Sequence, residues 1–356
     1  MSGGNVAAGP AGRQVFPAGG FGAAVVVVAA DSVADDSTLE LLGAARLLAE
    51  GRTGRSAREV TVLTLGATVP ENASLMFQAG ADHVVAAVAP WLADPAAEAR
   101  VSAITETVAL LQPSFVVMAH GAAAWEAAPR LSVRLDAGLV TDCVAIATPA
   151  GEGPPIATRP CFSGKALSDW SPTGDRPLII TLRKGTFAPA RPDPSRTGEV
   201  SILEPGRTPP ARIRTLSRQE GPANELRLED AEVVIGVGRG VGSSDEFRRY
   251  FLEGLAPALG AACGGSRGAV DLGIIPPELQ IGLTGRIVSP KLYLAVGLSG
   301  SPQHMAGCSG SQEIVAINTD PLAPIFGYAG RGVVGDYRRV VPALTERLLA
   351  LAATRL

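Results

Sequence analysis

Residues 299–307 read SGSPQHMAG and follow an apolar run that stops at Gly297. The segment holds His304, one of three histidines in the chain, directly after the amide side chain of Gln303. A histidine can donate a proton near neutral pH, and an amide both donates and accepts hydrogen bonds. Together they suit a cofactor with electron-rich carbonyl oxygens and ring nitrogens. A single histidine in a turn is more often structural, so the residues alone leave that alternative open.

A glycine-rich turn, IGVGRGVGSSDEF, spans residues 235–247 and is expected between a strand and a helix. Its glycines occupy every second position, at Gly236, Gly238, Gly240 and Gly242. No register therefore gives the G-x-G-x-x-G fingerprint of dinucleotide-binding proteins. Arg239 lies among the glycines, and Ser243 with Glu246 predicts a capping box for the following helix. Because helix N-termini attract anions, phosphate is the expected ligand, and a tight turn with a solvated arginine is the alternative.

Two further segments place small residues next to a side chain that could contact a ligand. The string CGGSRGAVDLG, residues 263–273, carries Ser266 and Arg267, and this arginine could equally be an ordinary surface charge. The string QIGLTGRIVSPKLY, residues 280–293, carries the hydroxyl of Thr284. A turn hydroxyl often bonds its own backbone, which is the alternative for Thr284.

The elements that must position these segments alternate along the chain. Strand-like runs are expected at 24–30, 60–65, 83–88 and 115–119, and helix-like runs at 38–50, 71–79, 95–111 and 123–135. Because these strands are apolar throughout rather than at every other residue, they predict a parallel sheet covered on both faces. Two later runs, 156–162 and 178–182, are separated by a turn rich in Gly, Ser and Pro and are interpreted as added antiparallel strands.

A change in composition divides the chain into two domains. Residues 191–228, rich in Pro, Arg, Ser and Thr, are interpreted as a linker that is interrupted only by the apolar run 200–203. Before it, residues 23–190 are expected to form the first α/β domain, and residues 1–22 a disordered lead. After it, residues 229–356 are expected to form a second, Rossmann-like domain. The predicted fold class is therefore α/β, with two doubly wound parallel-sheet domains.

The second domain repeats the alternation of strands and helices. A strand is expected at 232–236 and a helix at 245–259. The terminal helix has one apolar face, made of Val340, Val341, Leu344, Leu348 and Leu351. Open α/β sheets bind ligands beyond the carboxyl ends of their strands, where the segments described above are expected to lie.

Composition excludes several classes of protein. The chain has 356 residues, 46% of them hydrophobic, which is enough for two domains that each bury a core. A net charge of −3, with no polybasic patch or zinc spacing, argues against nucleic acid as a partner. The four cysteines are too far apart for a CxxC pair and are expected to be free thiols. Without a signal peptide or an apolar stretch near the ~20 residues of a membrane span, the sequence predicts a soluble, cytoplasmic protein with no membrane insertion.

Several of these strings resemble the alpha subunit of electron transfer flavoproteins. YLAVGLSGSPQHMAG and AINTDPLAPIF, at 293–307 and 316–326, are similar to its FAD-binding domain, as are the strings at 263–273 and 280–293. In the first domain, DAGLVTDC, RPCFSGKA and RKGTFAPA extend the resemblance over nearly the whole ordered chain. The resemblance implies that the second domain binds FAD and that the first packs on a beta subunit.

The resemblance also implies roles for individual residues. The residue equivalent to His304 donates to the flavin pyrimidine oxygen, Thr284 would meet the flavin N5 edge, and the charge of Arg267 would favour negative charge on the ring. Asn318 and Asp336, with the adjacent Tyr337, would lie at the adenosine end. The full set implied to contact FAD is Arg239, Ser266, Arg267, Ile281, Gly282, Leu283, Thr284, Ser299, Gly300, Ser301, Pro302, Gln303, His304, Asn318, Asp336 and Tyr337.

Two positions depart from the family pattern. Leu283 stands where the family has a glutamine, and the loss of that amide is expected to affect the redox potential more than binding. Residues 331–335, RGVVG, replace the usual YGIVA beside Asp336.

The implied function is a redox carrier rather than an enzyme. A heterodimer with a beta subunit would take electrons from donor dehydrogenases and deliver them to an acceptor oxidoreductase. No catalytic triad, carboxylate dyad or metal cluster is evident in the sequence, as expected for a carrier. One alternative is a flavin-based, NADH-oxidising (bifurcating) oxidoreductase complex, with a second flavin in the partner. Another is a nucleotide-binding regulatory protein without redox activity.

Overall fold

The computed structural model describes residues 25–29, 36–50, 58–93, 97–148, 154–162, 166–172, 176–206, 216 and 227–353. The expected disordered lead, 1–22, lies outside the described residues, as does most of the expected linker after residue 206. The chain forms two compact units, and the main part of the second spans Gln219–Leu356.

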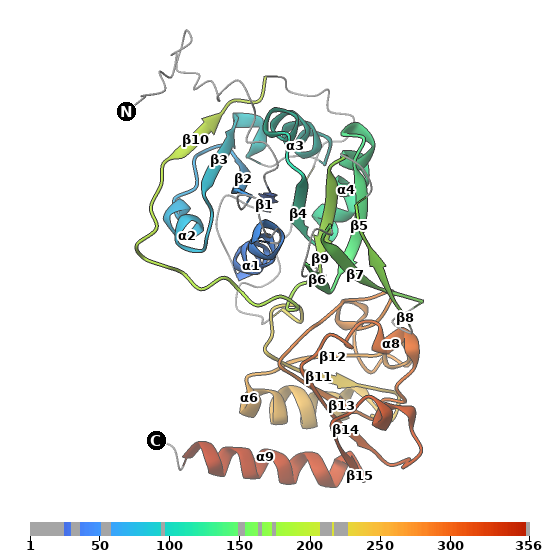
Figure 1. Ribbon diagram of the computed structural model, residues 1–356. Helices are drawn as coiled ribbons and strands as arrows, with labels where there is room; N and C mark the ends of the chain where they lie inside the picture. The colour runs from blue at the N-terminus through green and yellow to red at the C-terminus, as the bar shows by residue number, and fades with distance from the viewer. Residues whose placement is uncertain are drawn as a thin grey trace, which may run out of the picture. The chain divides into compact units, whose positions relative to one another are not determined.

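The first unit contains a seven-stranded sheet in which every pairing is parallel. In spatial order its strands are β10 (Val200–Leu203), β3 (His83–Val88), β2 (Val60–Gly66), β1 (Val25–Val28), β4 (Phe115–Ala119), β9 (Leu178–Leu182) and β5 (Gly138–Cys143). Helices α1 (Asp36–Glu50) and α2 (Ala73–Gln78) pack on one face, and α3 (Ala97–Leu111) and α4 (Ala122–Arg134) on the other (Figure 1). A short turn of 3-10 helix, η1 (Pro90–Leu92), follows β3. The expected parallel sheet with both faces covered is confirmed.

Strand β9 corrects the interpretation of residues 178–182 as an added antiparallel strand. It lies between β4 and β5 and is parallel to both. All five of its residues are buried, because a strand inside a parallel sheet is covered on both faces. The antiparallel pairing occurs instead in a separate sheet of β6 (Ala145–Ala147), β7 (Ile156–Cys161) and β8 (Ala166–Trp170), where β6 pairs with β7.

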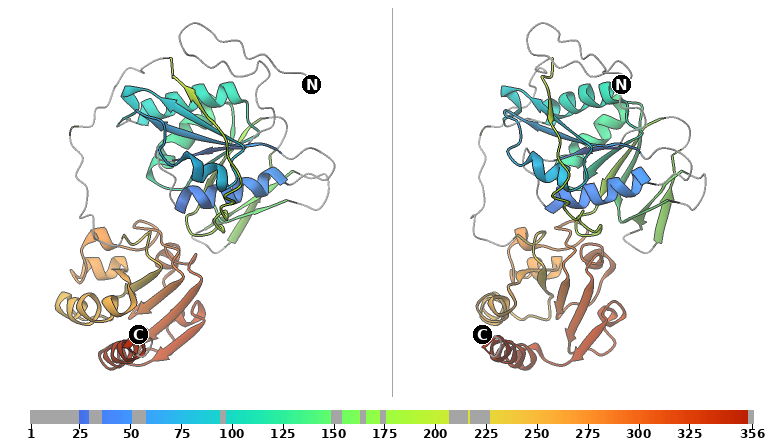
Figure 2. Two further views of the ribbon diagram at one scale, coloured as in Figure 1. Left: turned by 90° about the vertical axis from the view of Figure 1, so that its left-hand side faces the viewer. Right: turned by 60° about the vertical axis from the view of Figure 1, so that its left-hand side comes forward.

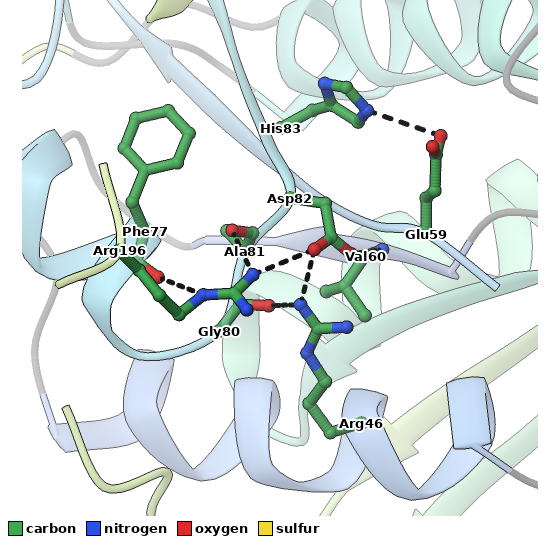
Figure 3. A network of polar contacts seen from close by, with 9 residues as sticks. All are labelled: Arg46, Glu59, Val60, Phe77, Gly80, Ala81, Asp82, His83 and Arg196. Atoms are coloured by element: carbon green, nitrogen blue, oxygen red, sulfur yellow. Dashed lines mark hydrogen bonds and ion pairs between the residues drawn. The ribbon is translucent and has the colours of Figure 1, made fainter. Parts of the chain in front are cut away.

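Part of the expected linker belongs to the first unit, which corrects the boundary placed at residue 191. Strand β10 lies inside the range 191–228 and pairs in parallel with β3 at the edge of the sheet. Just before β10, the guanidinium of Arg196 donates to the carbonyl oxygens of Phe77 and Ala81, at 3.1 Å each, and to Asp82 Oδ1 at 2.8 Å (Figure 3). A few specific contacts therefore fasten a segment whose composition is typical of a linker.

Asp82 is the centre of this polar network (Figure 3). Arg46 Nη2 donates to its Oδ1 at 2.8 Å, and the backbone N–H of Val60 donates to its Oδ2 at 2.9 Å. Burial raises the pKa of Asp82, but the hydrogen bonds from Arg46, Val60 and Arg196 and the charge of Arg46 outweigh it, so the pKa lies below its ordinary value. The ionised carboxylate thus joins α1, β2, the start of β3 and the segment before β10.

The second unit contains a five-stranded sheet that is also parallel throughout. Its spatial order is β12 (Ala262–Gly265), β11 (Val233–Val237), β13 (Leu292–Val296), β14 (Glu313–Asn318) and β15 (Arg331–Val334). One face is covered by α9 (Tyr337–Ala353) and by a continuous helical stretch of α5 (Ser244–Phe247), the π-helical η2 (Arg248–Leu255) and α6 (Ala256–Leu259) (Figure 2). The shorter helical turns are α7 (Arg267–Asp271), η3 (Pro277–Leu279), α8 (Pro302–Met305) and η4 (Pro324–Gly327). The second parallel α/β domain is confirmed.

The terminal helix packs as its apolar face predicts, except at its last position. Val341 is buried, and Val340, Leu344 and Leu348 pack against the same core cluster. Leu351 is 47% exposed, because the helix extends past the core that its earlier turns cover.

Candidate functional site

A cavity of about 830 Å³ lies at the carboxyl ends of the strands of the second unit. Its walls come from the loops that follow β11, β12, β13 and β14. The strand order reverses between β11 and β13, and ligands of open α/β sheets bind at such switch points. Thirteen of the residues expected at a ligand site line this cavity: Arg239, Ser266, Arg267, Ile281, Gly282, Leu283, Thr284, Ser299, Gly300, Ser301, Gln303, His304 and Asn318.

The loops after β11 and β13 meet through their backbones. The N–H of Gly240 donates to the carbonyl oxygen of Gly297 at 3.2 Å. A Cβ at Gly238 would lie 2.0 Å from that same carbonyl oxygen, so no larger residue fits there. This part of the cavity is therefore bare backbone, which a ligand can approach closely.

The loop after η3 packs on α8. The N–H of Leu283 donates to the carbonyl oxygen of Gln303 at 2.7 Å, and the N–H of Val288 donates to that of Gly307 at the same distance. Gly282 has φ +145°, and a Cβ on Gly307 would lie 2.4 Å from the Gly282 nitrogen. These contacts bring residues 281–284 and 303–304, which are far apart in sequence, into one cavity wall.

His304 lines the cavity but is only 4% exposed. Its Nδ1 lies 3.0 Å from the carbonyl oxygen of Ile281, and its Nε2 lies 2.8 Å from the hydroxyl of Tyr293. Burial lowers the pKa of His304 to about 4, against a smaller rise from the bond to Ile281. The imidazole is therefore neutral at pH 7, and both ring nitrogens have partners within the chain.

Two arginines supply positive charge at the cavity. The side chain of Arg267 is 71% exposed, and its Nε lies 3.8 Å from Asp271 Oδ2, one helical turn along. Arg239 extends across Gly268, where a Cβ would lie 2.8 Å from its Cγ. Arg267 is therefore an exposed surface charge that also borders the cavity, so both of the roles expected for it apply.

The side chains of Thr284 and Asn318 bond within the cavity wall. Thr284 Oγ1 accepts from the amide of Gln280 at 3.0 Å, so its partner is a side chain rather than its own backbone. Asn318 Nδ2 donates to the carbonyl oxygen of Leu298 at 2.8 Å, and its Oδ1 accepts from the N–H of Asp320 at 3.0 Å. Asn318 therefore ties the loop after β14 to the loop after β13.

The structure does not bring Asp336, Tyr337 or Pro302 into this cavity. Tyr337 is 5% exposed in the hydrophobic core, and its hydroxyl accepts from the N–H of Gly242 at 3.3 Å. Asp336 Oδ1 accepts from the N–H of Arg338 at 2.9 Å at the start of α9. Pro302 begins α8. Asp336 therefore accepts a hydrogen bond from the first turn of α9 in this structure.

The capping box expected at Ser243 and Glu246 is only half formed. The N–H of Glu246 donates to Ser243 Oγ at 3.2 Å. The carboxylate of Glu246 instead accepts two bonds from the guanidinium of Arg338, at 2.6 and 3.1 Å. That ion pair joins α5 to α9.

Several lining residues were not singled out as ligand contacts by the sequence. They are Gly238, Gly240, Gly268, Asp271, Leu272, Gln280, Gly297, Leu298, Asp320, Ala323 and Pro324. All of them lie within the glycine-rich turn 235–247 or the matching strings 263–273, 280–293, 293–307 and 316–326. The strings therefore carried the signal for these positions, and the sheet brings the separate loops together into one wall.

Three further features of the described residues bear on the kind of site that the chain can hold. Within the described residues, no group of three or more His, Cys, Asp or Glu could hold a metal ion. The same residues include no helix with the length and apolarity needed to cross a membrane. All four cysteines are described and are free thiols, as expected.

Comparison with known proteins agrees with this geometry. Residues 23–207 match the electron transfer flavoprotein domain, and residues 227–309 match the electron transfer flavoprotein FAD-binding domain. The electron transfer flavoprotein subunit alpha of Bacillus subtilis (strain 168) is 36% identical over 306 residues, which cover 85% of this chain and 92% of the relative. The electron transfer flavoprotein subunit alpha of Mycobacterium leprae (strain TN) is 38% identical over 317 residues, which cover 87% of this chain and 93% of the relative. The chain therefore belongs to the electron transfer flavoprotein alpha-subunit family.

Proposed function

We propose that the second unit holds FAD in the cavity at the carboxyl ends of β11–β14, with the flavin ring near Arg267, Thr284 and His304. The observation that carries this proposal is that these three residues, from three separate strings, line one cavity. The FAD-binding family match covers all three strings. The chain then serves as a redox carrier and breaks no substrate bond.

The residues of the cavity fit FAD. A volume of about 830 Å³ lies within the usual range for cofactor pockets. Bare backbone at Gly238 and Gly297 admits close approach of a large ligand, and two arginines supply charge that suits a pyrophosphate or an electron-rich ring. When bound, the flavin supplies the electron-accepting chemistry, and the protein supplies binding, orientation and electrostatics.

Four side chains in the wall have a defined task in this proposal. Arg267 and Arg239 favour negative charge in the cavity through Coulomb attraction, which makes the bound cofactor easier to reduce. Thr284, oriented by Gln280, presents a hydroxyl to the ring edge. His304, neutral at pH 7, acts through its position and dipole rather than as a standing cation. The sequence instead predicts a residue that donates a proton near neutral pH.

We further propose that the chain works with a beta subunit, as the names of its relatives indicate for those proteins. In that complex it would receive electrons from a dehydrogenase and pass them to an acceptor oxidoreductase. A cytoplasmic location is part of the same proposal.

Coexpression of the chain with its beta subunit tests the proposal. We expect the purified complex to contain one FAD per heterodimer and to show no oxidation of NADH. Two flavins with NADH turnover would identify a bifurcating complex instead. A complex with no flavin would contradict the proposal and favour a regulatory protein.

The charge of Arg267 can be tested in the same complex. Arg267→Ala should lower the midpoint potential of the bound flavin, because positive charge stabilises the reduced, more negative form. Arg331→Ala is the matched control, since Arg331 is exposed on β15 and does not line the cavity. An equal shift in both variants would show that Arg267 acts only through net charge.

A further inference from the structure

The contacts of His304 define where its proton lies. Its Nδ1 faces the carbonyl oxygen of Ile281, which can only accept, so Nδ1 carries the proton. Nε2 of the neutral ring is then an acceptor, and the hydroxyl of Tyr293, 2.8 Å away, donates to it. The ring is thus held at both nitrogens by groups from two different segments.

Tyr293 is held in position for this contact by the strand on which it lies and by the core around it. It lies on β13, is 0% exposed, and packs in the core cluster on the α8 side of the sheet. The neighbouring strand makes room for its hydroxyl, since a Cβ on Gly236 would lie 1.8 Å from Tyr293 Oη. The same Cβ would lie 2.4 Å from Tyr293 Cζ, so the end of the tyrosine ring, rather than a phosphate, requires the first glycine of the alternating string.

We propose that Tyr293 is a positioning residue of the flavin site, which holds the ring of His304 in one orientation in the cavity wall through its hydroxyl bond to Nε2. The proposal rests on the proposed function, because the orientation of His304 affects redox behaviour only when flavin is bound beside it. Tyr293 is fully buried and reaches the cavity through His304. The hydroxyl is the only group that phenylalanine would lack at this position, so the bond to His304 can be removed while the ring keeps its place in the core.

The test is a double-mutant cycle on the flavin potential of the coexpressed complex. Tyr293→Phe removes the hydroxyl and keeps the packing, and Tyr328→Phe is the control, because Tyr328 is 46% exposed on the same unit. We expect Tyr293→Phe to change the ratio of affinities for reduced and oxidised flavin about threefold, or about 30 mV in a one-electron couple. The same substitution should have no further effect in a His304→Gln background, because Tyr293 acts through His304. An equal shift in both backgrounds, or no shift in either, would overturn the proposal.

A second measurement keeps this test independent of flavin binding. The chain has only three histidines, so ring 15N signals of His-labelled protein can be assigned with the His304→Gln variant. Tyr293→Phe should move the Nε2 signal of His304 toward that of a nitrogen without a donor, and Tyr328→Phe should not. An unmoved signal overturns the positioning role. A wild-type complex without flavin, by contrast, overturns the proposed function and leaves this measurement to decide the contact.

Discussion

At the scale of single residues, burial decides the chemistry of the histidine in the cavity wall. The sequence predicts a proton donor at His304, because histidine ordinarily titrates near neutral pH. The structure removes it from water, so its pKa falls to about 4, and both nitrogens are already bonded to Ile281 and Tyr293. Any charge on this ring must therefore be induced by a ligand or by acid.

The lowered pKa of His304 predicts a pH-dependent stability. Between pH 4 and the ordinary histidine value of 6.5, the unfolded chain binds more protons than the folded chain, so the free energy of unfolding rises with pH across that window. Above it, this contribution is constant. The full effect is about 3 kcal/mol, from about 1.4 kcal/mol for each pKa unit.

Urea unfolding followed by circular dichroism between these pH values measures the effect. His304→Gln should lose most of this slope, whereas His83→Gln, which replaces a half-buried histidine at the start of β3, should keep it. Identical slopes in the wild type and both variants would contradict a buried, neutral His304.

At the scale of elements, parallel strand pairing assigns segments that composition misplaces. The run 178–182 is a fully buried central strand, and the run 200–203 forms the edge strand β10 within an otherwise polar stretch. Arg196 anchors the approach to β10 through carbonyl oxygens and the Asp82 carboxylate. Because these contacts come from a single residue, the composition of the segment does not indicate that it is held in place.

Arg196→Ala should destabilise the first unit by about 1–2 kcal/mol, because it leaves partly buried carbonyl oxygens and part of the Asp82 charge unpaired. All three tryptophans, Trp91, Trp125 and Trp170, lie in the first unit, so urea unfolding of the full chain by tryptophan fluorescence reports on that unit alone. Arg191→Ala, an exposed arginine of the same segment, is the control and should change the unfolding free energy by less than ~0.5 kcal/mol. Equal stabilities of the two variants would mean that segment 191–206 is held by the β10 pairing and not by Arg196.

At the scale of the whole molecule, the chain is two units with separate cores. Each unit has a parallel sheet with apolar clusters on both faces, and the cavity belongs wholly to the second. Ligand binding stabilises the folded state that contains the site, so its direct effect is confined to that unit.

Addition of FAD to a flavin-free complex tests this division. At about 100 times its Kd, FAD should stabilise the second unit by about 2.7 kcal/mol. Hydrogen exchange should therefore slow in peptides from β11 and β13 and their following loops, and stay unchanged in peptides from β1 to β3. Protection that is equal in both units would place the effect of FAD outside the proposed cavity.

The sequence by itself determined the family, the α/β class, most strands and helices, and thirteen of the residues that line the cavity. It could do so because those signals are local: apolar runs, loop strings and the order in which they follow one another. The tertiary structure alone decided the place of β9 and β10, the neutral state of His304, its contact with Tyr293, and the exclusion of Tyr337 from the cavity. Each of these depends on which distant segments pair and on how completely that pairing buries a side chain away from water. Neither property can be inferred from any single segment of the sequence.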